Sequence, residues 1–315
     1  MESNSSINIR VLRCNKENMF KLSDLFFKSK GIKIPSSYFE KKYDTSYTGK
    51  SYFGFMAVDS SGEAIAFYGQ FPCLISIEGQ KHLACQVGDV ITRPDYQKKG
   101  LFTLLGKTAS QFAKEQGVNF LFCVPNENSK PGFIKSLGWR TESHFKIFEW
   151  RVKTLPVYRI LHKLRIPFIY GVYLNIFKFI FSQSPQQFIG QTQKNEVFTV
   201  FKSEDYIQYK KYNSNFLIRW KGIGIWAKID GRLVIGEIDF ENKLSALEII
   251  AKLKSLARVL GIERIVFEIQ ANSKLFEIFS EEFQSTEGLS ICYHSLNKKI
   301  EGTDFTISAC DPDPF

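Results

Sequence analysis

Hydrophobic and polar residues follow two periodicities in the first half of the chain. Residues 7–15 largely alternate, which is typical of a half-buried strand. Residues 16–30 and, more clearly, 100–116 place apolar side chains at helical spacing. Further strands are predicted at 51–58, 64–70, 74–77, 82–92, 118–124 and 145–152, and a short helix at 133–137. This order predicts a mixed α/β layer.

The same order of elements returns in the second half. Strands are predicted at 197–201, 216–226, 227–229, 232–240, 264–269 and 289–296. Helices are predicted at 204–212, 245–260 and 273–282. Asp230-Gly231 is typical of a hairpin turn. Two halves with the same order of elements, but without close sequence identity, indicate a tandem repeat of one fold.

A chain of 315 residues suits two domains of ordinary size. We expect a first domain at 1–152, a connecting segment at 153–195, a second domain at 196–300 and a tail at 301–315. The connecting segment is aromatic, basic and interrupted by prolines. The tail is polar, and we expect it to pack loosely.

Positive charge is concentrated in the connecting segment. The chain holds 42 Lys and Arg against 32 Asp and Glu, a net charge of +10. From Trp150 to Asn195 there is no acidic residue, and seven basic residues lie there. The rest is nearly balanced, which argues against a nucleic-acid-binding face. Residues 154–181 therefore suit either an amphipathic contact with an anionic membrane surface or a helix pair that packs between domains.

Several features predict a cytoplasmic protein without a metal. The longest uncharged run of membrane character, 166–177, is shorter than the roughly 20 residues that a spanning helix needs. The polar N-terminus is not followed by a signal peptide. The six cysteines form no CxxC pair and are expected to be buried free thiols. The four histidines have no metal-ligand spacing. Any membrane contact would then be peripheral, on the inner face.

Candidate chemistry is concentrated at 89–102, where a strand leads through a turn into a helix that starts at a glycine. Backbone N–H groups at such a helix start favour anions. Gly100 allows the backbone to approach a phosphate, and Lys98 and Lys99 add positive charge. The segment has neither the P-loop nor the Rossmann glycine pattern. These residues predict a phosphate cradle, although an ordinary strand–turn–helix with two solvated lysines would have the same pattern.

The segment from Pro94 to Phe102 resembles the acetyl-CoA-binding motif of the GNAT acyltransferase superfamily. Gln97 and Gly100 match that motif, whereas Phe102 stands where glycine or alanine is usual. Asn126 and Ser129, before Gly138-Trp139, are similar to the superfamily's second motif along the CoA arm. The resemblance covers about residues 7–152. It implies a GNAT fold, a mixed and mostly antiparallel sheet with flanking helices, followed here by a degenerate GNAT-like domain.

The resemblance also implies a mechanism and a set of site residues. Acetyl-CoA would bind where two parallel central strands separate, and an amine would attack the thioester directly. The resemblance assigns cofactor binding to Val90, Ile91, Thr92, Gln97, Lys98, Lys99, Gly100, Leu101, Phe102, Asn126 and Ser129. Asp89 is the candidate general base, and Glu40, Glu127, His82 or a water chain are the alternative bases. A structural hydrogen bond is the alternative role for Asp89. Cys123 has apolar neighbours, which favours burial over a nucleophilic role.

The second half lacks the Gln-x-x-Gly pattern, and its acidic turn Glu241-Asn242 would repel pyrophosphate. Arg219 and Trp220 resemble a segment of tandem bacterial acyltransferases and are candidate substrate residues; surface pairing and core packing are the alternatives. We therefore expect an acetyl-CoA-dependent N-acetyltransferase. Its expected acceptor is an amino sugar, nucleotide-linked or lipid-linked, in bacterial surface polysaccharide synthesis. Alternatives are an amine antibiotic, polyamine or peptide as acceptor, an aminoacyl-tRNA-dependent ligase, or a non-enzymatic CoA-binding or membrane-associated protein.

Overall fold

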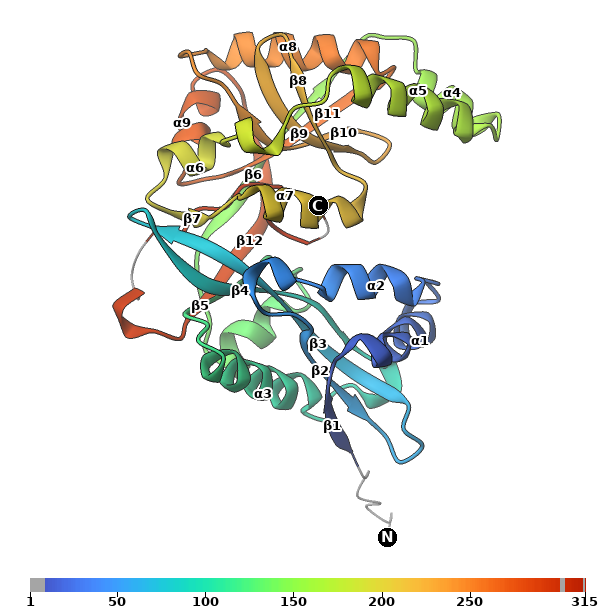
Figure 1. Cartoon of the computed structure of the whole chain (residues 1–315), viewed down its shortest axis with the longest axis vertical. Coiled ribbons are helices and arrows are strands. Elements are labelled where there is room, and N and C mark those ends of the chain that lie inside the picture. The colour runs from blue at the N-terminus through green and yellow to red at the C-terminus, as the bar shows by residue number, and fades with distance from the viewer. Residues whose placement is uncertain (1–8, 301–303, 314) are drawn as a thin grey trace. The chain divides into compact units, whose positions relative to one another are not determined.

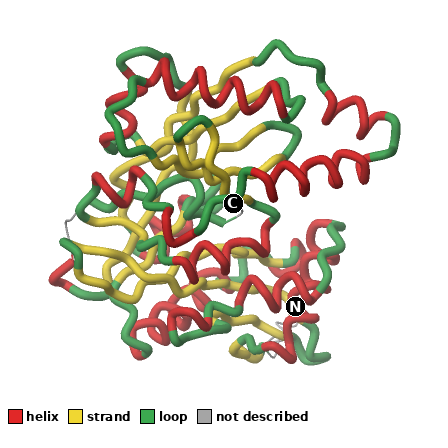
Figure 2. The backbone as a smooth tube through the Cα atoms, turned by 45° about the horizontal axis from the view of Figure 1, so that its top comes forward, coloured by secondary structure: helices red, strands yellow, loops and turns green. Residues whose placement is uncertain are grey.

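The chain folds into two compact units. A computed structural model describes residues 9–300, 304–313 and 315 (Figure 1). Unit one holds Met1–Ile75, Lys81–Glu142 and Ile291–Thr303, and unit two holds Ser76–Gln80, Ser143–Ser290 and Asp304–Phe315. Each unit combines strands with helices around them (Figure 2). The predicted α/β class, with mixed sheet and flanking helices, is confirmed.

Unit one is built on a mixed sheet in the order β1-β2-β3-β4-β5-β12. Its strands are β1 (Arg10–Arg13), β2 (Phe53–Val58), β3 (Ala64–Ile77), β4 (Gln80–Thr92), β5 (Phe120–Cys123) and β12 (Thr286–Ser295). β4 and β5 run parallel, whereas β1–β2, β2–β3 and β5–β12 are antiparallel pairs. The parallel pair requires a crossover connection, which the helix between β4 and β5 supplies.

Helices cover both faces of this sheet. They are α1 (Met19–Lys30), α2 (Ser36–Tyr43) and α3 (Leu101–Glu115), with short 3-10 turns at Lys16–Asn18, Ser46–Thr48 and Pro94–Tyr96 and a π turn at Gly132–Ser136. Successive strand residues point to opposite faces. Phe55 and Ala57 of β2 therefore pack in the core that contains Leu105 of α3, whereas Met56 and Val58 pack in the core formed with α1 and α2.

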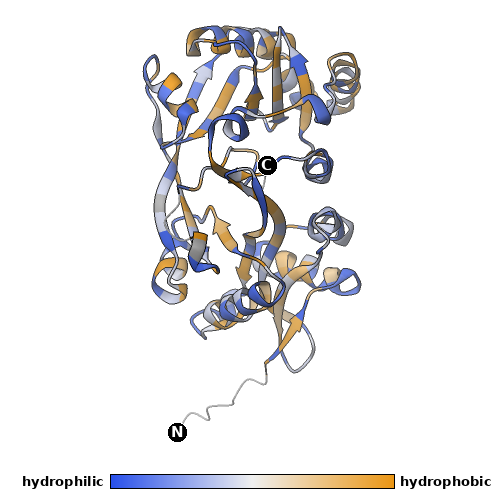
Figure 3. Ribbon diagram, turned by 60° about the vertical axis from the view of Figure 1, so that its left-hand side comes forward, coloured by the Kyte–Doolittle hydropathy of each residue, from blue (hydrophilic) through white to orange (hydrophobic). Residues whose placement is uncertain are grey.

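Unit two is built on strands in the order β12-β6-β11-β10-β9-β8, with parallel and antiparallel pairs. They are β6 (Arg140–Arg151), β8 (Phe216–Trp220), β9 (Ile223–Ile229), β10 (Leu233–Asp239) and β11 (Arg264–Gln270), and the short strand β7 (Phe198–Val200) lies outside this order. Its helices are α4 (Val157–Lys163), α5 (Pro167–Ile180), α6 (Gln191–Asn195), α7 (Glu204–Lys210), α8 (Ala246–Val259) and α9 (Lys274–Ser280). β10 and β11 are parallel, and α8 lies between them in the chain. The strands are largely hydrophobic, and the helices carry both hydrophobic and hydrophilic residues (Figure 3).

Some local predictions were wrong. The strand predicted at 216–226 is a hairpin, because Lys221 and Gly222 both have positive φ, +47° and +83°, and reverse the chain between β8 and β9. The strands predicted at 64–70 and 74–77 form the single strand β3. Helix α2 was not predicted. The predicted turn at Asp230-Gly231 is present, between β9 and β10.

The two units depart from the predicted boundaries 1–152 and 196–300. Residues 143–152 belong to unit two, and residues 291–303 belong to unit one. The boundaries differ because each predicted domain contributes a strand segment to the other unit. The last part of β12 pairs with β5, with Cys292 opposite Cys123, whereas β6 pairs with β11. The predicted connecting segment, with α4, α5 and α6, also lies in unit two.

The tail after residue 303 is packed, contrary to expectation. Asp311 and Phe315 are only 1 % and 2 % exposed. The ammonium of Lys202, fully buried, lies 3.1 Å from the Asp311 carboxylate and 3.8 Å from that of Glu237. Burial opposes the charge on Lys202, but these carboxylates outweigh it and raise its pKa. A buried lysine without such partners would be costly, so the acidic tail belongs to the core of unit two. Residue 314 and residues 301–303 lie outside the described part.

Candidate active site

Unit one contains a pocket of about 620 Å³ where β4 runs toward α3. Most of the predicted cofactor residues line it. They are Val90, Ile91, Thr92, Gln97, Lys98, Gly100, Leu101, Phe102, Asn126 and Ser129. Lys99 and Asp89 are not among the lining residues. The two sequence motifs, which are separated by α3 and β5 in the chain, therefore meet at one cavity.

The pocket exists because β4 and β5 separate. Their parallel pairing runs from Ala84–Phe120 to Gln86–Phe122, but β4 continues to Thr92. Asp89 has a φ of +52°, a conformation that non-glycine residues rarely adopt and that interrupts a regular strand. The backbone from Val90 to Thr92 is thus left beside a cavity instead of a neighbouring strand. This is the separation of two parallel strands that the resemblance implies.

The start of α3 forms a cradle of backbone N–H groups. Gly100 is the residue before the helix, with a φ of +77° and open space where a side chain would begin. Lys98 also has a positive φ, +60°. The first-turn N–H groups of a helix have no partner within the helix, and no described side chain caps this one. Since Gly100, Leu101 and Phe102 line the pocket, these donors and the helix dipole favour an anion there.

Phe102 does not fill the cradle. Its ring packs edge-on against Phe133, with the centroids 5.3 Å apart, and lies 6.0 Å from the ring of Tyr68. The side chain thus joins the core beneath α3. A phenylalanine is accommodated at the position where the family usually has glycine or alanine, because these aromatic neighbours receive its ring.

Asn126 and Ser129 form a local turn on the other side of the pocket. The Asn126 side-chain oxygen accepts bonds from the backbone N–H of Asn128 and of Ser129, at 3.1 and 3.0 Å. It also accepts from the Ser129 hydroxyl at 3.1 Å. An asparagine that holds its own backbone in this way is an Asx turn. The turn fixes polar groups along the wall where the resemblance places the CoA arm.

Lys99 does not line the pocket, and its ammonium contacts an aromatic ring instead. Its ammonium lies 4.7 Å from the centre of the Tyr96 ring, and Arg93 lies 4.9 Å from the same ring. Such cation–π contacts hold the turn at 94–96 in place. Sequence reasoning missed the lining residue Lys30, which comes from the end of α1. No signal near the motif could have found it, because only the packing of α1 brings it there.

Asp89 is engaged in a buried ion pair. Its carboxylate lies 2.8 Å from the ammonium of Lys42 and accepts a 3.0 Å bond from the Tyr43 hydroxyl. The side chains of Lys42 and Asp89 are 3 % and 10 % exposed. Such a pair stabilises the ionised carboxylate and costs several kcal/mol to break. The geometry favours the structural alternative for Asp89, since it sits outside the pocket lining and already has two partners.

The described cysteines are buried free thiols. Burial raises the pKa of the Cys123 thiol well above its ordinary value, and the hydrogen bond with Cys292 raises it further. A thiol that remains protonated is a poor nucleophile. Cys123 therefore has a packing role.

Arg219 and Trp220 lie in unit two and do not line the pocket around Gly100. Trp220 is buried against Phe181, with ring centroids 4.9 Å apart. The Arg219 guanidinium, half-exposed, lies 3.9 Å from the carboxylate of Asp239. Their contacts are those of a core tryptophan and a surface arginine.

In the described part of the chain, no group of three or more His, Cys, Asp and Glu is placed to hold a metal ion. None of the described helices has the length and apolarity that crossing a membrane requires.

The sequence of residues 15–141 matches the family model of the acetyltransferase (GNAT) domain. This part of the chain is a GNAT acetyltransferase domain. The protein is an N-acyltransferase that uses acetyl-CoA as its acyl donor. The matched residues include α1, β2 to β5 and the whole of α3, and thus the walls of the pocket. No curated protein matches the sequence.

Solved structures share the fold over most of the chain. A GCN5-related N-acetyltransferase from Kribbella flavida is 11 % identical, with a TM-score of 0.59, and the match covers 92 % of this chain and 72 % of that one. A probable N-acyltransferase from Enterococcus faecalis is 12 % identical, with a TM-score of 0.56 and coverages of 91 % and 73 %. A putative acetyltransferase from Pyrococcus horikoshii is 10 % identical, with a TM-score of 0.54 and coverages of 94 % and 92 %. At these identities the likeness shows the fold alone.

The pocket fits the chemistry of an acyl-CoA. Pyrophosphate is an anion, and the first turn of α3 offers N–H donors beside Lys98. The pantetheine arm needs a wall with polar backbone groups, which the end of β4 supplies. When bound, acetyl-CoA contributes the activated thioester. The chain's own residues would orient it and place N–H groups where charge develops on the carbonyl oxygen.

Proposed function

We propose that this enzyme acetylates the amine of an amino sugar carried on a nucleotide or a lipid, in the synthesis of a bacterial surface polysaccharide. The observation that carries the choice of acceptor is the charge of the pocket. Among its described lining residues there is no carboxylate, whereas Lys30 and Lys98 are present. A polyamine or a cationic antibiotic would meet positive charge, whereas a phosphate-linked sugar complements it.

We assign the CoA pyrophosphate to the backbone of 97–102 and the pantetheine arm to Val90–Thr92 and Asn126. Deprotonation of the acceptor amine is then assigned to water in the pocket. Neither a carboxylate nor an imidazole occurs among the described lining residues, and Asp89 is held by Lys42. Direct attack on the thioester requires no covalent enzyme intermediate, so the buried Cys123 is not needed.

Calorimetric titration of acetyl-CoA into wild type and Gly100→Glu tests the cradle. We expect one site per chain, and at least tenfold weaker binding in the variant, about 1.4 kcal/mol. The new carboxylate would repel pyrophosphate. The matched control is Gly49→Glu, since Gly49 has a φ of +76° and open space but does not line the pocket. Equal losses in both variants, or none in Gly100→Glu, would place the donor elsewhere.

Acetyl transfer assays with paired acceptors test the acceptor class. We expect kcat/KM to be higher for a nucleotide-linked amino sugar than for the free amino sugar, and lowest for spermidine. Lys98→Gln should reduce the difference in kcat/KM between the nucleotide-linked and the free amino sugar, because it lowers the local positive potential. A preference for spermidine would contradict the proposal, while leaving the acetyl-CoA site intact.

We also propose that unit two is a degenerate copy of the acyltransferase fold that does not bind CoA. Support comes from its order of elements, in which β10, α8 and the parallel strand β11 repeat β4, α3 and β5. The helix start differs. The Ser245 side chain caps α8, because it accepts a hydrogen bond from the backbone N–H of Glu248. At the start of α3, by contrast, no described side chain caps the first-turn N–H groups. The expected stoichiometry of one acetyl-CoA per chain tests this assignment.

A second proposal is peripheral contact of α4 and α5 with an anionic membrane. Helix α5 is apolar on two sides. Tyr170 and Phe177 are buried, yet a second row is exposed. This exposed row holds Phe168 (68 %), Val172 (57 %), Ile176 (55 %), Phe179 (84 %) and Ile180 (63 %). The helices extend beside the sheet of unit two (Figure 1), and Arg159, Lys163 and Arg165 on or next to α4 are exposed as well. Exposed apolar residues beside basic ones complement an anionic lipid surface.

Vesicle co-sedimentation tests the membrane contact. Wild type should bind vesicles that contain phosphatidylglycerol more tightly than neutral ones. Phe168→Ser with Phe179→Ser should lose at least a hundredfold in affinity, since each buried Phe contributes about 1.5–3 kcal/mol. The control is Phe20→Ser with Phe27→Ser, because these are exposed phenylalanines of α1, in unit one. If both double variants behave alike, α5 is not the contact.

A further inference from the structure

Three arginines form a row across the ends of the neighbouring strands β6, β11 and β10 in unit two. Arg264 begins β11 and lies directly opposite Arg151, at the end of β6. Arg232 precedes Leu233, whose partner across the parallel β10–β11 pair is Ile265, so Arg232 stands next to Arg264. Like charges directly opposite one another destabilise a sheet. The sheet therefore carries three neighbouring cations at a cost that an anion would relieve.

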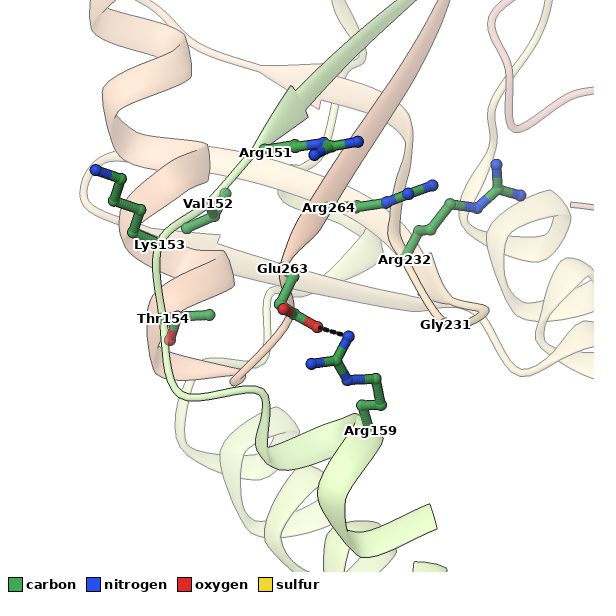
Figure 4. A pocket seen from close by; sticks show the side chains of 9 residues that line it. All are labelled: Arg151, Val152, Lys153, Thr154, Arg159, Gly231, Arg232, Glu263 and Arg264. Carbon is green, nitrogen blue, oxygen red and sulfur yellow. Dashed lines mark ion pairs between the residues drawn. The ribbon is translucent and has the colours of Figure 1, made fainter. Parts of the chain in front are cut away.

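The row borders a pocket of about 680 Å³. Its lining adds Lys153, Arg159 and one carboxylate, Glu263 (Figure 4). The Arg159 guanidinium pairs with Glu263 at 3.2 Å, and Arg264 lies 3.6 Å from the carboxylate of Glu149. Both pairs are between exposed side chains and are weak. Half-buried Glu268 also interacts with Arg232. The lining itself still holds five cations against one carboxylate.

The arginine side chains are available for a ligand. Figure 4 shows Arg151 of β6, Arg264 of β11 and Arg232 of the turn before β10 reaching out on the same side of the sheet, while Lys153 points the other way. In the described part of the chain, neither Arg151 nor Arg232 has an ion-pair partner within 4.0 Å. A guanidinium presents a planar fork of donors that matches phosphate oxygens in pairs. Such a row suits a multivalent phosphoryl anion better than a single carboxylate.

We propose that this arginine pocket (Arg151, Arg232 and Arg264, with Lys153 and Arg159 at its rim) binds a diphosphate group. It is separate from the CoA cradle, because all its residues belong to unit two. The diphosphate belongs to a soluble nucleotide-type ligand or to a phosphorylated lipid headgroup. Both sources offer the same oxygens to the arginines. The proposal does not depend on the acceptor proposed above.

Thermal unfolding with inorganic pyrophosphate tests the pocket. The experiment uses the full chain in the Gly100→Glu background, so that the CoA cradle does not contribute. Pyrophosphate should raise the Tm, because a ligand that binds only the folded state stabilises it. Arg232→Gln and Arg151→Gln should each weaken pyrophosphate binding about tenfold. The Tm increase that pyrophosphate causes should become smaller as the salt concentration rises. Arg10→Gln is the matched control, since Arg10 is an exposed arginine of β1 that does not line the pocket.

A second readout separates binding from a structural role. Without any phosphate in the buffer, Arg151→Gln should unfold at a Tm equal to or above that of the parent protein, because it removes the repulsion between Arg151 and the directly opposite Arg264. A structural arginine would instead lower the Tm. Arg232→Lys keeps the charge but loses the planar fork, and it should bind pyrophosphate with intermediate affinity.

Vesicles distinguish the two sources of the diphosphate. If the source is lipid, vesicles that contain a polyprenyl diphosphate should bind in a manner that requires Arg151 and Arg232, and pyrophosphate should compete. If the source is soluble, pyrophosphate should bind, and vesicle binding should be the same with and without Arg151 and Arg232. The proposal is overturned if neither probe binds, or if the arginine variants bind both probes as well as Arg10→Gln does.

Discussion

At the residue scale, the contacts of single side chains separate chemical roles from structural ones. Asp89 has the position in the chain that suits a catalytic base, yet its partners Lys42 and Tyr43 are those of a structural ion pair. We infer that Asp89 is a positioning residue, which holds the irregular backbone of β4 beside the pocket. Its positive φ, next to Val90, is the local feature that this pair stabilises.

Asp89→Asn should therefore lower the free energy of unfolding by about 3–5 kcal/mol, because it leaves the Lys42 ammonium buried without a counterion. Chemical denaturation measures this loss. The double variant Lys42→Met with Asp89→Asn should recover part of it. The kcat of the folded fraction should change less than tenfold, with an unchanged pH profile. A hundredfold loss of kcat at unchanged stability would instead identify Asp89 as the base.

Glu268 is a second residue whose environment has a measurable consequence. Burial raises the pKa of its carboxyl group, although Arg232 and Lys228 oppose the change. A folded-state pKa above the unfolded value means that the folded protein holds the proton more tightly. This contribution favours folding below the ordinary Glu pKa of about 4.3 and is lost as the pH rises through the folded-state value.

Glu268→Gln should thus stabilise the protein at pH 7, by about 0.5–2 kcal/mol, as is common for stabilising substitutions. The gain should disappear below about pH 4, where the carboxyl is protonated in both states. Urea denaturation at both pH values measures it. Glu241→Gln is the control, since Glu241 is exposed, and it should show neither effect. A variant that is less stable at pH 7 would mean that the attraction of Arg232 and Lys228 exceeds the cost of burial.

At the element scale, turns decide where strands end. The predicted strand 216–226 has a continuous pattern of apolar residues, and Lys221-Gly222 is a weak turn signal because lysine rarely adopts a positive φ. The prediction failed there because the hairpin pairing of β8 with β9 imposes the turn. The strand–turn–helix at β4 and α3 was predictable, since Pro94, Gly100 and the helical spacing after it agree with one another.

Lys221→Asn should stabilise the hairpin by about 0.5–1 kcal/mol, because Asn-Gly suits a two-residue turn in which both φ values are positive. Thermal unfolding measures the gain. Gly222→Ala, which places a methyl group at a φ of +83°, should destabilise by a similar amount. A loss of stability in Lys221→Asn would show that the lysine side chain contributes more than the strain of its backbone costs.

At the scale of the whole molecule, each unit depends on segments that are distant in sequence. Unit one needs Ile291–Thr303, and unit two needs Asp304–Phe315. The two central strand pairs explain the dependence. β5 pairs on one side with β4 and on the other with residues 292–295 of β12. Without β12, the buried edge of β5 would expose unpaired backbone groups.

The fragment 1–152 should consequently fail to fold alone, although it contains every described residue that lines the pocket around Gly100. Circular dichroism and acetyl-CoA calorimetry on the fragment measure this, with the full chain as control. We expect no cooperative unfolding transition and at least a tenfold loss of affinity. A fragment that unfolds cooperatively and binds acetyl-CoA like the full chain would show that β12 is dispensable.

Sequence patterns predicted the class of the fold and the local motif around Gln97 and Gly100. These depend on periodicity and on backbone conformation within a few residues, which neighbouring side chains set. The meeting of groups that are distant in the chain depends on tertiary packing. This packing placed Lys42 against Asp89, Lys30 at the pocket and Arg151 beside Arg264. It also placed β12 beside β5 and the acidic tail around Lys202. Strand pairing and the burial of charge join residues far apart in the chain, and no local pattern records their partners.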